Sequence, residues 1–214
     1  MIIYTMQPMV KKAMGCCFEI FLKIFPLSHC LTSSCFLAIF TKNQHLKSIL
    51  SEYQLGITIK RLAHQVLENH DSFSDTVIIG LQPRGIYLSD KIVEEIRNEL
   101  PDKTIHYGKL DITFYRDDVR KELHFANKTD ISFSIENKKV VLIDDVLYTG
   151  RTIRAALDAL IDFGRPQKVE LCVLIDRRFS RELPIQPDYV GKAIDSIVSQ
   201  KVTVEWDKNE VVLY

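Results

Sequence analysis

Residues 140–152 read VVLIDDVLYTGRT, a run of apolar residues that passes directly into polar and glycine-containing sequence. The four residues Val140–Ile143 are typical of a strand buried on both faces of a sheet. Two acids follow the run, and a turn containing Gly150 leads into a predicted helix over 151–163, which Gly164 and Pro166 close. A buried strand that turns at once into a helix is a unit of α/β proteins.

Segments on either side repeat this alternation. In chain order, helical spacing covers 55–67 and 86–100, and strand patterns cover 76–81, 104–112, 169–175, 201–206 and 211–214. The last two strands flank a turn at 207–209 and predict a terminal hairpin. Strands alternating with helices predict an α/β fold with a mainly parallel, twisted sheet and helices on both faces.

The chemistry is expected at the carboxyl end of the strand at 140–143, because ligands of such sheets bind outside the strand ends. Gly150 allows a sharp turn whose N–H groups can converge on an anion, and the following helix dipole attracts phosphate. Asp144 and Asp145 are suited to accepting hydrogen bonds from a sugar diol or holding a divalent cation. Phosphate, diol and Mg²⁺ together describe a phosphorylated ribose.

A simpler interpretation makes the Asp144-Asp145 pair a helix cap and a solvated loop charge. It leaves the rest of the 13-residue stretch unexplained. The chain contains no G-x-x-x-x-G-K-[ST] sequence and no G-x-G-x-x-G after a strand, so two other nucleotide-binding motifs are absent.

The stretch 140–152 resembles the phosphoribosyl-pyrophosphate signature of type I phosphoribosyltransferases. Together with RGIYL at 84–88, DITFYRDD at 111–118 and RELPI at 181–185, it resembles the PyrR family from about residue 49 to 214. The resemblance implies a uracil phosphoribosyltransferase that uses Mg²⁺, forms UMP and pyrophosphate, and also binds pyrimidine-operon messenger RNA.

The same resemblance assigns roles to individual residues. Catalytic roles fall to Asp144, Asp145 and Arg116. The phosphoribosyl-pyrophosphate loop comprises Asp144, Asp145, Val146, Leu147, Tyr148, Thr149, Gly150, Arg151 and Thr152. The pyrophosphate loop comprises Gln82, Pro83, Arg84 and Gly85. A flexible flap is expected at 116–130, and a small hood that contacts the base is expected around Asp176, Arg177 and Val190. Mg²⁺ is expected to arrive with the substrate, with Asp144 and Asp145 as its nearest protein groups.

The RNA contacts implied by the resemblance are basic side chains, namely Lys60, Arg61, His64, Arg181 and Lys192. The sequence departs from the family next to the hood, where Arg178-Phe179-Ser180 replaces a Gly-His pair. It departs again at Gln186, where many members have Arg. Two other functions stay open: an RNA-binding attenuator with vestigial catalysis, and a purine-base phosphoribosyltransferase.

Composition divides the 214 residues into a segment 1–45 and a domain 46–214. The first segment has four of the five cysteines, all four methionines and a net charge of +3, which leaves −3 for the rest. Its apolar part is too short and polar for a membrane span and lacks zinc-binding spacing. We interpret it as a disordered or non-native leader, with a membrane anchor or a packed element as alternatives. The domain is expected to be cytoplasmic and to form a homodimer or larger homo-oligomer.

Overall fold

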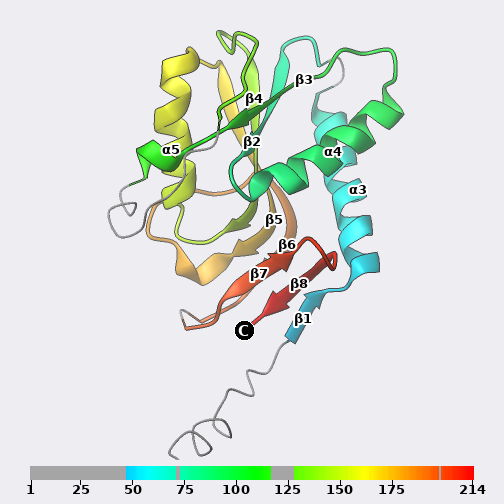
Figure 1. The fold of residues 1–214 in the computed structure, drawn as a ribbon, viewed down its shortest axis with the longest axis vertical. Helices are drawn as coiled ribbons and strands as arrows, with labels where there is room; N and C mark the ends of the chain where they lie inside the picture. The colour runs from blue at the N-terminus through cyan, green and yellow to red at the C-terminus, as the bar shows by residue number, and fades with distance from the viewer. Residues whose placement is uncertain (1–46, 71–72, 117–127, 198) are drawn as a thin grey trace, which may run out of the picture. The chain divides into compact units, whose positions relative to one another are not determined.

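The computed structural model describes residues 47–70, 73–116, 128–197 and 199–214. Its centre is a five-stranded parallel sheet in the order β3-β2-β4-β5-β6 (Figure 1). The strands are β2 (Thr76–Leu81), β3 (His106–Leu110), β4 (Lys139–Leu147), β5 (Lys168–Arg177) and β6 (Tyr189–Ile194). From β2 the chain adds β3 on one side and then β4, β5 and β6 on the other, so the strand order reverses between β2 and β4. Open α/β sheets bind ligands at such a point.

Three helices cover the sheet, which confirms the predicted α/β fold. Helix α3 (Glu52–Asn69) and helix α4 (Gly85–Glu99) lie on one face, and helix α5 (Arg151–Leu160) lies on the other. Helix α3 begins with a capping box, in which Ser51 and Gln54 satisfy each other's backbone N–H groups. Helix α5 is shorter than predicted, since its last turn, η3 (Ile161–Phe163), is a 3₁₀-helix.

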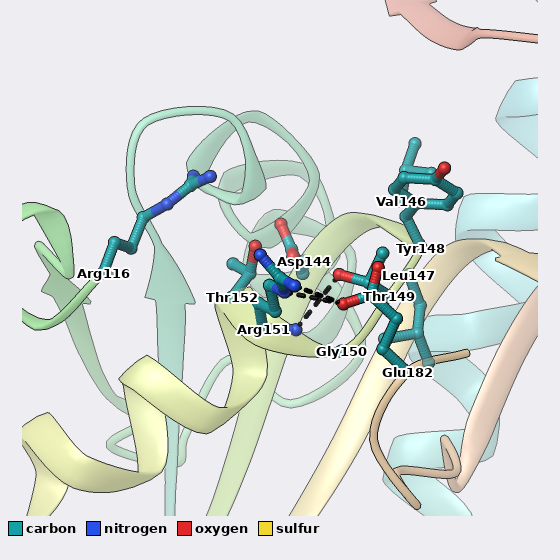
Figure 2. Close-up of a pocket in the computed structure, with 10 residues that line it drawn as sticks. All are labelled: Arg116, Asp144, Val146, Leu147, Tyr148, Thr149, Gly150, Arg151, Thr152 and Glu182. Atoms are coloured by element: carbon teal, nitrogen blue, oxygen red, sulfur yellow. Dashed lines mark hydrogen bonds and ion pairs between the residues drawn. The ribbon is translucent and has the colours of Figure 1, made fainter. Parts of the chain in front are cut away.

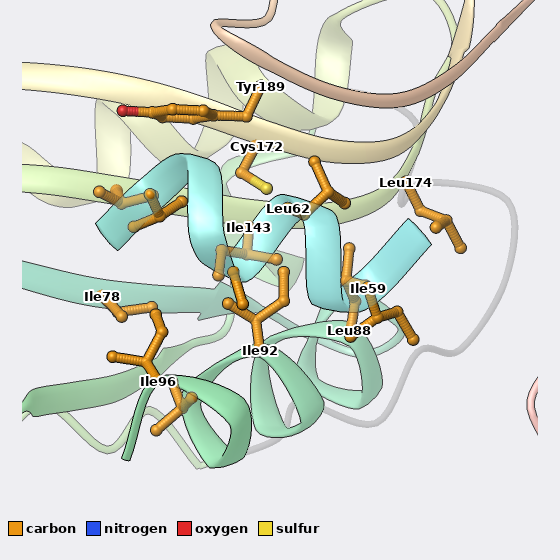
Figure 3. Close-up of a cluster of buried hydrophobic side chains, with 14 of the residues drawn as sticks. Ile59, Leu62, Ile78, Leu88, Ile92, Ile96, Ile143, Cys172, Leu174 and Tyr189 are labelled. Atoms are coloured by element: carbon orange, nitrogen blue, oxygen red, sulfur yellow. The ribbon is translucent and has the colours of Figure 1, made fainter. Parts of the chain in front are cut away.

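Each face of the sheet has its own hydrophobic core. Alternate residues of β4 divide between them: Val141 and Ile143 pack toward α3 and α4, and Val140 and Leu142 pack toward α5. Figure 3 shows the first core, in which Ile59 and Leu62 of α3 and Ile92 of α4 meet the sheet. Because β4 is buried on both sides, any polar residue in it must also be accommodated in the interior.

A second, three-stranded sheet has the order β1-β8-β7, and we call it the hood. Strands β7 (Val202–Glu205) and β8 (Glu210–Leu213) form the predicted hairpin. Strand β1 (Lys47–Leu50), which the sequence did not predict, pairs antiparallel with β8. Buried Val204 and Val211 join the core beneath α3 and α4, so the hood packs against the same face as these helices.

The structure corrects three other expectations. Strand β4 continues through Asp144 and Asp145 to Leu147, so the two acids lie within the strand and not beyond it. Strand β5 likewise includes Asp176 and Arg177. Val190, expected in a hood that contacts the base, lies in β6, the edge strand of the main sheet.

Two expectations concern segments that are wholly or largely outside the described residues. The interpretation of 1–45 and most of the flap at 116–130 stay predictions. Among the described residues, η1 (Thr113–Tyr115), a 3₁₀-helix, comes just before the predicted flap, and Asp130 at the end of the flap bridges to Lys109. None of the helices in the described part of the chain is long and apolar enough to cross a membrane.

Strand β1 provides a test of where the folded domain begins. A chain starting at His45 should keep the melting temperature of the full chain. A chain starting at Ser51 loses the β1–β8 ladder and the buried side chain of Leu50, which should cost about 2–3 kcal/mol. Its melting temperature should therefore fall by about 5–10 °C. Calorimetry on both chains checks this, and equal melting temperatures would contradict a stabilising role for β1.

Candidate active site

Two carboxylates are buried in the middle of the sheet. Asp144 and Asp145 are each only 6% exposed, and strand alternation points them to opposite faces. Asp144 Oδ1 accepts a hydrogen bond of 2.9 Å from the Asp145 N–H. Asp145 Oδ2 lies 3.0 Å from Arg84 Nε as an ion pair, and within the described residues it has no further partner. Because a carboxylate oxygen has two lone pairs, it can accept from a further donor.

Burial also changes the acidity of the pair. It raises the pKa of Asp144 well above the ordinary carboxyl range, and the neighbouring charge of Asp145 raises it further. Burial raises the pKa of Asp145 as well, while the Arg84 guanidinium limits that rise. Both carboxylates are therefore poorly solvated when ionised, and a cation or hydroxyl donor beside them would be strongly favoured.

A cleft of about 290 Å³ opens at the carboxyl end of β4 (Figure 2). Its floor is the turn from β4 into α5, where Gly150 has φ 93° and forms the N-cap of the helix. Only glycine adopts this conformation without strain. The lining residues are Arg116, Asp144, Val146, Leu147, Tyr148, Thr149, Gly150, Arg151, Thr152 and Glu182. The structure thus gathers the N-terminus of α5, two carboxylates and two arginines around one space.

The turn after β2, Gln82–Arg84, lies beside β4. A Cβ atom on Gly85 would be 2.6 Å from the carbonyl oxygen of Ile143, so glycine allows this turn to approach β4. The buried side chain of Gln82 donates to the Lys128 carbonyl, at 3.0 Å. Arg84 reaches Asp145 and also donates to the Val204 carbonyl of the hood, at 3.2 Å. One arginine therefore connects the carboxylate pair to the hood.

Comparison with known proteins places the chain in a family. Residues 45–209 match the phosphoribosyl transferase domain model. The chain is 48% identical over 164 residues to the bifunctional protein PyrR of Mannheimia succiniciproducens, covering 74% of this chain and 90% of that one. It is 42% identical over 171 residues to the bifunctional protein PyrR of Bacillus subtilis, covering 77% and 93%. The chain belongs to the PyrR family. The resemblance noted from the sequence motifs is thereby confirmed.

Solved structures agree with the PyrR-family fold. A hypoxanthine phosphoribosyltransferase from Staphylococcus aureus matches with a TM-score of 0.56 and 24% identity, over 71% of this chain and 79% of that one. The hypoxanthine phosphoribosyltransferase of Trypanosoma cruzi matches with a TM-score of 0.60 and 17% identity, over 78% and 95%. At these identities the likeness concerns the fold alone, and it confirms the type I phosphoribosyltransferase architecture.

The residues predicted to form the base site of this PyrR-family protein have internal partners. Arg177 is buried, and its guanidinium donates to the side chain of Ser196 and to the carbonyls of Ile197 and Gln200. It also lies over the Tyr148 ring, 4.1 Å from the centroid. Asp176 pairs with Arg181. Val190 packs in the α5-side core and does not line the cleft.

The predicted RNA-contact residues divide into two groups. Lys60, Arg61 and His64 are exposed on α3, and Arg61 donates to the carbonyls of Val190 and Gly191, next to exposed Lys192. Arg181 does not join them. Its side chain is only 19% exposed and is bound to the main chain where β4 turns into α5. Grouping Arg181 with an exposed basic surface was therefore wrong.

Sequence reasoning also missed Glu182, which lines the cleft and pairs with Arg151. Its position in the quoted RELPI motif was the only signal. Arg116 lies across the cleft from the turn in Figure 2.

The raised pKa of Asp144 predicts that this carboxylate destabilises the unliganded protein. Between the ordinary carboxyl pKa of about 3.9 and the raised value, the native state binds more protons than the unfolded state, so stability falls as pH rises. Asp144→Asn keeps the Oδ1 acceptor and removes the charge. It should raise the melting temperature at pH 8 by at least about 3 °C, and the difference should shrink toward pH 4.

The exposed Asp75 offers a matched control, because Asp75→Asn removes a charge from the surface and should leave the melting temperature nearly unchanged. A lower melting temperature for Asp144→Asn at every pH would contradict the proposed cost of the buried charge.

Proposed function

We propose that the protein transfers the 5-phosphoribosyl group of phosphoribosyl pyrophosphate to N1 of uracil. The bond from N1 to the anomeric carbon forms, the bond from that carbon to pyrophosphate breaks, and the N1 proton leaves to solvent. The products are UMP and pyrophosphate. The supporting observation is the buried carboxylate pair beside the Gly150 turn, in a chain of the PyrR family.

The 5′-phosphate is assigned to the turn Thr149–Thr152. The N-terminus of α5 supplies backbone N–H groups and the positive end of the helix dipole. The hydroxyls of Thr149 and Thr152 supply further donors at the cleft wall. The geometry fits an anion held mainly by backbone groups, as phosphate is at many helix N-termini.

The ribose hydroxyls are assigned to Asp144 and Asp145. Asp145 Oδ2 can accept from a further donor. The ionised form of both carboxylates is stabilised when a donor or cation replaces the missing solvation. The same pair fits Mg²⁺ carried by the substrate, because Mg²⁺ prefers carboxylate oxygens and substrate phosphates. Bound Mg²⁺ would neutralise the charge that develops on the departing pyrophosphate.

Pyrophosphate is assigned to the turn Gln82–Gly85, with Arg84 and Arg116 as the cationic groups. Asp176, Arg177 and Val190 keep their assignment to the base region, where Arg177 acts by fixing Tyr148 and the segment before β7. Catalysis then consists of positioning and charge stabilisation, since the anomeric carbon needs no protein nucleophile. An intact carboxylate pair argues against vestigial catalysis.

A second activity, binding of pyrimidine-operon messenger RNA, is supported by the exposed residues Lys60, Arg61, His64 and Lys192. The domain is slightly acidic outside residues 1–45, so RNA phosphates would have to be held by this local set. Two subunits placing their α3 helices side by side would double it, which links RNA binding to a homodimer. Both activities use cytoplasmic ligands, and we place the protein in the cytoplasm.

A product assay tests the enzyme. Phosphoribosyl pyrophosphate, Mg²⁺ and each free base should give UMP with uracil and no nucleotide with hypoxanthine or guanine. The double variant Asp144→Asn, Asp145→Asn should lower kcat/KM for uracil by at least about 100-fold, since it removes charge that acts in the transition state. Turnover with purines in place of uracil, or full activity in the folded double variant, would overturn the assignment.

Charge reversal tests RNA binding. Lys60→Glu with Lys192→Glu should abolish binding of a pyrimidine-leader hairpin and leave uracil transfer intact, because neither residue lines the cleft. Wild-type affinity should fall with salt by about 0.7–0.9 logarithmic units per phosphate contacted for each tenfold increase. Arg165→Glu, exposed beyond the opposite face of the sheet, is the matched control. Undetectable or salt-insensitive binding by the wild type would leave a plain enzyme.

A further inference from the structure

The segment Arg181–Ile185, which follows β5, holds the turn from β4 into α5 through its main chain and the Arg181 side chain. The N–H groups of Glu182 and Leu183 both donate to the Thr149 carbonyl, at 3.1 and 3.2 Å. Arg181 Nη1 donates to the carbonyls of Leu147 and Tyr148, at 3.1 and 2.5 Å. Three successive carbonyls of the turn are thus bound by one short segment that is more than 30 residues away along the chain.

Peptide planarity makes these bonds relevant to the ligand. In a trans peptide the N–H of the next residue points opposite to the carbonyl. When the carbonyls of Tyr148 and Thr149 face Arg181–Ile185, the N–H groups of Thr149 and Gly150 face away from it. Within the described part of the chain, neither of these two N–H groups donates a hydrogen bond. They are therefore available to an anion in the cleft.

Arg181 is itself fixed by several partners. Its Nη2 pairs with the carboxylate of Asp176 at the end of β5, and its Nε donates to the Ile185 carbonyl at 3.1 Å. A guanidinium can serve these acceptors together because it has five N–H donors in one plane. A lysine ammonium has one nitrogen and cannot bridge the same set. The number and spread of the acceptors therefore account for arginine at this position.

The side chains of the segment complete the contact. Glu182 accepts from Arg151 Nε at 2.7 Å at the rim of the cleft (Figure 2). A Cβ atom on Gly150 would lie 3.2 Å from Ile185 and 3.4 Å from Leu183, so the segment also packs closely on the turn.

We propose that Arg181 is a positioning residue for phosphoribosyl pyrophosphate: by fixing the Tyr148 carbonyl, it directs the Thr149 N–H toward the 5′-phosphate, beside the Gly150 N–H that is oriented by the bonds from Glu182 and Leu183 to the Thr149 carbonyl. This role rests on the assignment of the 5′-phosphate to Thr149–Thr152. It replaces the RNA contact that the sequence suggested for Arg181, and it gives the RELPI motif a function in substrate binding.

Arg181→Lys and Arg181→Gln test the role by separating phosphate binding from base binding. KM for phosphoribosyl pyrophosphate should rise about 10- to 100-fold, as expected when a binding group is displaced by about 1 Å, and KM for uracil should change less than about twofold. Affinity for ribose 5-phosphate, measured by calorimetry, should fall by the same factor as KM for phosphoribosyl pyrophosphate rises. Arg178→Gln is the matched control, because among the residues that the structure describes Arg178 pairs with exposed Asp195 and lies over the ring of Phe179.

Ribose 5-phosphate binding keeps this test separate from the choice of base. If the wild type binds ribose 5-phosphate but does not use uracil, the proposed reaction fails and the role of Arg181 is still measured. If the Arg181 variants do not fold, Asp176→Asn is measured in their place, because it removes one anchor of Arg181 and keeps its carbonyl contacts. It should lower the affinity for ribose 5-phosphate by a smaller factor than that expected for the Arg181 variants. Unchanged ribose 5-phosphate affinity in folded Arg181 variants, or a loss confined to RNA binding, would overturn the proposal.

Discussion

The site depends on two adjacent carboxylates buried in the strand that both cores share. Burial of β4 on both faces removes water from Asp144 and Asp145, and the protein replaces that solvation only in part, through backbone N–H groups and Arg84. Burial therefore still raises the pKa of both groups. A ligand that brings hydroxyl donors or a cation supplies the missing solvation, so some stability of the free protein is exchanged for affinity. The position of the acids within the sheet therefore shapes both folding and binding.

The turn from β4 into α5, to which we assign the 5′-phosphate, has its carbonyl groups bound and its N–H groups oriented before a ligand arrives. Its carbonyls are bound on the outer side by Arg181 and by two backbone amides, and its N–H groups are left for the inner side. Satisfying one half of each peptide group internally leaves the other half oriented and available, without reorganisation when the ligand arrives. Two arginines connect the hood to the site. Arg84 binds both Asp145 and the Val204 carbonyl, and Arg177 binds the segment that leads into β7.

The two proposed activities occupy different parts of the chain. The cleft lies at the carboxyl ends of the parallel strands, and the exposed basic residues lie on α3 and at the edge strand β6. Arg61 joins these two elements through the carbonyls of Val190 and Gly191. An RNA site on this surface could thus be altered by substitution while the cleft stays intact. Moving Arg181 from the surface set to the phosphate turn makes this separation sharper.

Local sequence determined the order of strands and helices, the Gly150 turn and the grouping of phosphate-binding and acidic residues at one strand end. These features follow from side-chain period, backbone freedom and composition, which act over a few residues. Only the tertiary structure decided that β1 pairs with β8, that β4 continues past its acids, and which partners Arg84, Arg177 and Arg181 take. Strand pairing joins the two ends of the domain, and a guanidinium on a long side chain can reach acceptors from several segments. Such contacts depend on which distant residues the fold brings together, and no local pattern encodes them.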